Sequence, residues 1–92
     1  MIECSGDSLR VTAPMVIANA RELLLRGQEA LANVSRVDLA AVPDADSSAL
    51  TVLFAWMRRT QAQGRSFSVV NPPASLLSLA ALYGVADLLP LA

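Results

Sequence analysis

Short apolar runs alternate with helical segments along this chain, and this alternation constrains the fold more than any other feature. The first two runs, 1–4 and 8–12, are separated by Ser5-Gly6-Asp7, which predicts a hairpin. Further strands are expected over 35–42 and 66–70. Helices are expected over 15–31, 49–63 and 74–82, and a last fragment over 86–89. The order predicts an α/β fold with a mostly parallel four-stranded sheet, an antiparallel first hairpin and three to four helices.

Length and composition indicate one small domain, residues 1–92, with an excess of apolar side chains. A chain of 92 residues buries only about 60–65% of its unfolded surface. Hydrophobic residues make up 54% of the sequence, more than a core of this size easily covers. We therefore expect a permanent protein partner. The strand over 35–42 alternates only loosely, so we expect it to be covered on both faces.

The charge pattern argues against nucleic acid and membrane as direct partners. Seven arginines oppose eight acidic residues, and the arginines cluster only at Arg58-Arg59. Neither a polybasic run nor an apolar stretch of about 18 residues is present, so direct membrane insertion is not expected. Cys4 is the single cysteine; we expect a buried thiol in the first strand and a cytoplasmic location.

The residue types needed for common catalytic and metal sites are missing. The chain has no histidine and one cysteine, which excludes histidine-dependent nucleophile pairs and a structural zinc site. Its four glycines are isolated, so no phosphate-binding loop is predicted. Asp38, Asp44 and Asp46 could together approach a cation, but turn and cap roles explain them better. We expect a protein that is not an enzyme and that has no cofactor or metal.

Asp46-Ser47-Ser48 stands where a strand region ends and an apolar helix begins. A helix N-terminus exposes unpaired N–H groups and a partial positive charge. Asp46 or Ser47 is expected to cap the helix. The hydroxyls of Ser47 and Ser48 are either further caps or a place where a partner or phosphate is received.

The helix over 49–63 has apolar residues on two faces. Leu50, Leu53, Phe54 and Met57 form the face that we assign to the sheet. A second strip consists of Ala49, Val52 and Trp56, flanked by Ser48 and Arg59. Either the C-terminal residues of the same chain cover Trp56, or the strip is a docking surface that begins at the hydroxyls.

These motifs together resemble the STAS domain family, the fold of the anti-sigma factor antagonists. The resemblance covers nearly the whole chain. It rests on Val-Asp-Leu at 37–39, Asp-Ser-Ser-Ala-Leu at 46–50, Gln-Gly at 63–64, Val-Asn-Pro-Pro at 70–73 and the tail Leu-Ala-Ala-Leu-Tyr-Gly-Val at 79–85. The family usually has glycine where this chain has Ala49, which slightly crowds the helix N-terminus.

The resemblance implies two alternative functions. One branch of the family comprises small cytoplasmic subunits that bind the ATPase of an ABC transporter, which moves phospholipids to maintain outer-membrane lipid asymmetry. The short hairpin and the tail Leu-Tyr-Gly-Val-Ala-Asp-Leu-Leu-Pro at 82–90 favour it. This branch implies a contact role for Ser47 and a location at the inner membrane through the ATPase. The antagonist branch implies phosphorylation of Ser48 by an anti-sigma factor serine kinase, with Ser47 as the alternative site.

Overall fold

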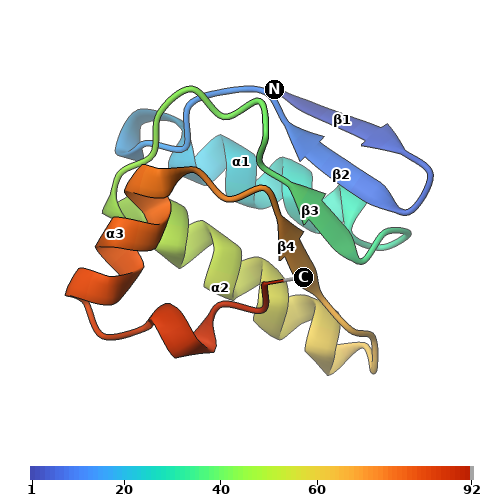
Figure 1. Cartoon of the computed structure of the whole chain (residues 1–92). Helices are drawn as coiled ribbons and strands as arrows, with labels where there is room; N and C mark the ends of the chain where they lie inside the picture. The colour runs from blue at the N-terminus through green and yellow to red at the C-terminus, as the bar shows by residue number, and fades with distance from the viewer. Residues whose placement is uncertain (92) are drawn as a thin grey trace.

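The structure, a computed structural model, describes residues 1–91 and has the predicted order of elements (Figure 1). The strands are β1 (Ile2–Ser5), β2 (Ser8–Val11), β3 (Arg36–Asp38) and β4 (Ser68–Val70). The helices are α1 (Ile17–Ala30), α2 (Ser47–Ala62), α3 (Ala74–Leu82) and a short 3-10 helix, η1 (Ala86–Leu88). The predicted helix over 74–82 has the observed bounds, whereas the predicted strand over 35–42 is five residues too long.

The four strands form one sheet in the order β1-β2-β3-β4. β1 pairs antiparallel with β2, and the β2–β3 and β3–β4 pairs are parallel. Leu9, Val37 and Val69 lie side by side in register across β2, β3 and β4. Beyond β4, Leu91 forms a parallel bridge with Val69. The predicted α/β architecture is confirmed.

The helices cover one face of the sheet, so the expected cover on both faces of the third strand is wrong. Leu9, Val11, Val37 and Val69 are buried on the helical side. On the other side, Arg10 and Arg36 are exposed and Asp38 is half-buried. The apolar run continued past Asp38 because Leu39 and Val42 enter the core from a loop, and a loop has no strand periodicity.

Cys4 is exposed, which corrects the expected buried thiol. It lies opposite the buried Leu9 in the hairpin register. β1, however, is the edge strand, and of its four residues only Ile2 is even half-buried. Position at the sheet edge, rather than residue type, decides the exposure of this thiol.

Candidate functional site

The start of α2 is fixed by Asp46, one of the two residues predicted to cap it. Ser47, the other candidate, is the first residue of the helix. The carboxylate accepts hydrogen bonds from the Ser48 backbone N–H at 2.8 Å and from the Ser48 hydroxyl. It also accepts one from the backbone N–H of Ile17, the first residue of α1, at 3.0 Å. These hydrogen bonds lower the pKa of Asp46 below its ordinary value. The bond from the Ser48 hydroxyl has the largest effect, followed by the bonds from the two backbone N–H groups. One carboxylate therefore joins the starts of two helices.

Backbone pairing reinforces this junction. Met15, just before α1, donates its N–H to the Asp44 carbonyl at 2.8 Å. The Asp46 N–H donates to the Met15 carbonyl at 3.1 Å, which completes a parallel bridge between Met15 and Ala45. The loop before α2 is thereby held to the loop before α1, so the hydroxyls that follow Asp46 are presented from a rigid base.

The two adjacent serines have different surroundings. Ser48 is half-buried, and its hydroxyl is engaged with Asp46. Ser47 is exposed, and its hydroxyl has no hydrogen bond to any other residue in 1–91. Of these two hydroxyls, only that of Ser47 can donate a hydrogen bond to an external partner without breaking a bond within residues 1–91.

The strip of Ala49, Val52 and Trp56 is not an exposed surface, which corrects that expectation. All three residues are buried, and Trp56 is 0% exposed. The cover is α1 rather than the C-terminal residues: the Trp56 indole N–H donates to the Leu24 carbonyl at 3.2 Å. A Cβ atom at Gly27 would lie 2.2 Å from the Trp56 ring, so glycine is needed for this contact. Arg59, predicted to flank the strip, is exposed near the end of α2.

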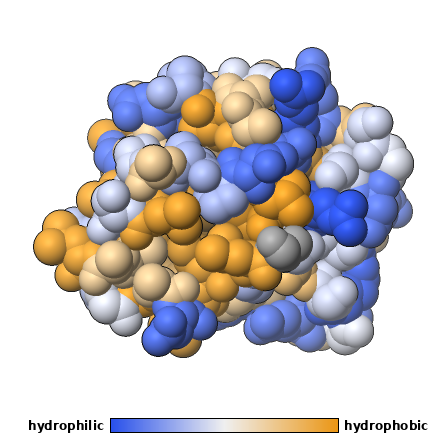
Figure 2. Space-filling model, in the orientation of Figure 1, coloured by the Kyte–Doolittle hydropathy of each residue, from blue (hydrophilic) through white to orange (hydrophobic). Residues whose placement is uncertain are grey.

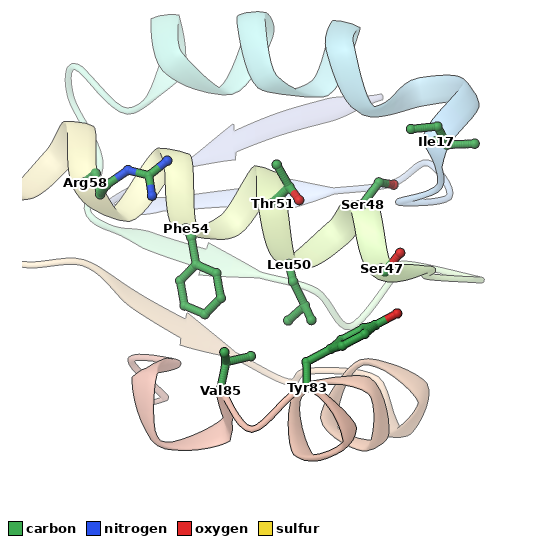
Figure 3. Close-up of a pocket in the computed structure, with 9 residues that line it drawn as sticks. All are labelled: Ile17, Ser47, Ser48, Leu50, Thr51, Phe54, Arg58, Tyr83 and Val85. Carbon is green, nitrogen blue, oxygen red and sulfur yellow. The ribbon is translucent and has the colours of Figure 1, made fainter.

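The accessible side of α2 is the one that bears Phe54. Leu50 and Leu53 are buried as predicted, but Phe54 and Met57 are only half-buried. A groove of about 570 Å³ runs along this side. We call it the α2 groove; it is lined by Ile17, Ser47, Ser48, Leu50, Thr51, Phe54, Arg58, Tyr83 and Val85. Figure 3 shows Ser48 and Thr51 on the α1 side of α2, and Leu50 and Phe54 directed toward Val85 and Tyr83.

The α2 groove continues into a second hollow of about 290 Å³. Phe54, Arg58 and Val85 line both, and Met57 and Leu88 complete the second. Two of the lining residues, Tyr83 and Leu88, are 56% and 61% exposed, and Leu82 at the end of α3 is 76% exposed. Apolar residues gather over the α3–η1 half of the molecule in Figure 2. Sequence reasoning missed this wall of the groove, because Val85 and Leu88 lie in a segment without helical or strand periodicity.

Arg58 is the one charged residue that lines either hollow. Within residues 1–91, the only ion pair joins Arg26 and Glu22 at 3.1 Å, so Arg58 has no acidic partner there. In the same residues, no group of three or more histidine, cysteine, aspartate or glutamate side chains is placed to hold a metal ion. None of the helices in the described part of the chain is long and apolar enough to cross a membrane. The geometry is that of a binding groove with hydroxyls at one end and a cation at the other.

Comparison with known proteins identifies the family. A family model described as "Mlab, STAS domain" matches residues 3–90. STAS domains are in general binding and regulatory domains rather than enzymes. Comparison with curated protein sequences found no significant match.

Solved structures share the fold. A Thermotoga maritima protein, described provisionally as an anti-sigma factor antagonist, has a TM-score of 0.77 at 16% identity, over 99% of this chain and 83% of its own. The unphosphorylated anti-sigma factor antagonist SpoIIAA gives 0.66 at 13% identity, over 89% and 81%. The phosphorylated form of the same Bacillus cell fate determinant gives 0.68 at 14% identity, over 100% and 89%. With the family model over almost the whole chain and this shared fold, the chain belongs to the STAS domain family.

Proposed function

We propose that this chain is a non-enzymatic accessory subunit that binds the ATPase of an ABC transporter, in the manner that its MlaB-type family description suggests. The transporter moves phospholipids and maintains outer-membrane lipid asymmetry. The subunit is cytoplasmic and reaches the inner membrane only through the ATPase, an MlaF-like protein. It supports assembly and activity of the ATPase without chemistry of its own.

The observation that carries the proposal is the free hydroxyl of Ser47 at the rim of an apolar groove. A constitutive contact with a partner protein needs an exposed hydroxyl that has no hydrogen bond within the chain, next to apolar surface that the partner can cover. Ser47 meets that need, since the neighbouring Ser48 hydroxyl is engaged with Asp46. The contact surface is the α2 groove rather than the buried strip of Trp56.

Co-purification with the ATPase subunit tests this function. Ser47→Asp adds a carboxylate beside Asp46 at an exposed first-turn position, where an acid favours the helix, so the fold is retained. We expect it to weaken ATPase binding by roughly tenfold. The matched control is Ser75→Asp, the same change at an exposed serine in the first turn of α3 outside the groove. Failure of the wild-type chain to bind the ATPase, or equal binding by Ser47→Asp, would contradict the proposal.

A second candidate function is that of an anti-sigma factor antagonist controlled by a serine kinase. It is favoured by the position of Ser48 at the rim of the α2 groove, where a phosphate would act on a docked partner. Phosphorylation would place nearly two negative charges against Asp46 and remove the hydrogen bond that the Ser48 hydroxyl donates. Intact-mass analysis of protein from its native cell would then show a phosphorylated species that Ser48→Ala lacks.

A further inference from the structure

We propose that the α2 groove receives an amphipathic helix of the partner, and that a carboxylate on this helix pairs with Arg58. The inference rests on the proposed function and specifies the partner's chemistry. Leu50, Phe54 and Arg58 follow one another at four-residue spacing along the groove side of α2. The apolar side chains of Leu50 and Phe54 are therefore followed, one turn further along the helix, by the guanidinium of Arg58.

The two ends of the groove differ in charge. Asp46, with its lowered pKa, stands behind the serine hydroxyls at one end. Arg58 is eleven residues after Ser47, which along a helix is about 16 Å. Neither hollow is lined by an acidic residue that could neutralise Arg58. A partner that covers the groove must therefore supply the negative charge itself, or leave a partly desolvated arginine unpaired.

The shape of the groove suits a helix. One wall is α2, with Leu50 and Phe54 about one turn apart, and the other bears Tyr83 and Val85 (Figure 3). Met57 and Leu88 extend the apolar lining into the second hollow. Apolar anchors repeated at three- and four-residue spacing on a partner helix would fill a groove between such walls. Its acidic residue would lie about three turns from the residue over Ser47.

A second copy of this chain fits less well. A symmetric dimer through the groove would present the same patch twice, with Arg58 as its only charge on each side. It would bury two arginines without providing a carboxylate from the groove. Charge complementarity thus favours a different protein with an acidic amphipathic helix.

The test uses the purified chain and the purified ATPase subunit in titration calorimetry. Arg58→Glu should weaken binding at least tenfold, and raising the salt concentration should weaken the wild-type complex more than the variant complex. Arg21→Glu, the same charge change at an exposed position of α1 outside the groove, should stay within about twofold of wild type. Thermal unfolding of both variants checks that the fold is intact. Single acid-to-arginine changes on the exposed helices of the ATPase should include one that restores binding to Arg58→Glu.

The outcomes separate this inference from the function on which it rests. Binding of the ATPase by wild type and Arg58→Glu with equal affinity overturns the inference and leaves the proposed function standing. Weakened binding that no acid-to-arginine change restores overturns the ion pair. A wild-type chain that does not bind the ATPase overturns both. Sedimentation that shows a dimer, dissociated by Arg58→Glu, assigns the groove to a second copy instead.

Discussion

Two adjacent serines at the start of α2 differ because one carboxylate engages only the second of them. Asp46 binds the hydroxyl and the N–H of Ser48, and its other oxygen binds the N–H of Ile17. The cap of one helix is therefore also a tie to another helix 29 residues earlier in the chain. Ser47 takes no part in these hydrogen bonds and is exposed to solvent.

Protonation of Asp46 should weaken the fold in acid. Its pKa is lower in the folded state than its ordinary value near 3.8, so its stabilisation is complete above about pH 4 and is lost as the pH falls through the folded-state pKa. Asp46→Asn keeps a capping oxygen but removes the charge. Urea unfolding should show the variant less stable than wild type at pH 7, with the difference smaller at pH 3. A difference that stays constant between the two pH values would contradict this origin.

Single-residue features were predictable where they depend on neighbours in sequence. The Asp46 cap follows from local chemistry and is confirmed. Gly64 after α2 has a left-handed backbone with φ of 73°, a conformation that glycine adopts readily at the end of a helix. The exposure of Cys4 and the bond from Ile17 to Asp46 depend on which strand is at the edge and where two loops meet. The sequence pattern around each residue predicts neither the exposure of Cys4 nor the hydrogen bond from Ile17 to Asp46.

At the scale of elements, α2 packs in two directions, which explains its two apolar faces. Leu50 and Leu53 belong to the buried core, while Trp56 packs on α1. A helical wheel shows that a face is apolar but not what covers it, and so it could not distinguish a docking strip from a helix–helix contact. The one available signal was Gly27 within a helical pattern, because an isolated glycine in a helix often marks a close approach.

The α1–α2 contact predicts that Gly27→Ala destabilises the fold, although glycine-to-alanine changes within helices usually stabilise. Glycine to alanine within a helix ordinarily stabilises by up to about 1 kcal/mol. At Gly27 the added methyl would lie 2.2 Å from the fully buried Trp56 ring. We expect Gly27→Ala to destabilise by about 1–3 kcal/mol, measured by urea unfolding.

A double-mutant cycle is the control for Gly27→Ala. Trp56→Leu alone should destabilise because it leaves a cavity, but adding Gly27→Ala to it should cost less than adding Gly27→Ala to wild type. A rise in the unfolding midpoint of Gly27→Ala on its own would show that α1 and α2 are not in the described contact.

At the scale of the whole molecule, polar and apolar surfaces are separated. The open face of the sheet bears Arg10, Arg36 and Asp38, whereas Tyr83 of the α2 groove and Leu88 of the second hollow are exposed. Figure 2 shows apolar surface gathered over the α3–η1 half of the molecule. The fold class was predictable because element order and connection rules leave few arrangements. The position of the apolar patch was not, because it depends on how the irregular segment after α3 returns past α2.

This separation predicts that two exposed leucines differ in their effect on ATPase binding. Leu88 lines the second hollow and is 61% exposed; Leu25, on α1 outside both hollows, is 51% exposed. Each change to glutamine should alter the free energy of unfolding by less than about 0.5 kcal/mol, because neither side chain is buried. Leu88→Gln should weaken ATPase binding about tenfold, since it removes an apolar contact at the groove wall, and Leu25→Gln should change it less than twofold.

Amides of the Tyr83–Val85 loop should also exchange hydrogen more slowly in the wild-type complex than in the free chain. If Leu25→Gln proves the more damaging change, the ATPase binds the outer side of α1 and the α2 groove is not the docking surface.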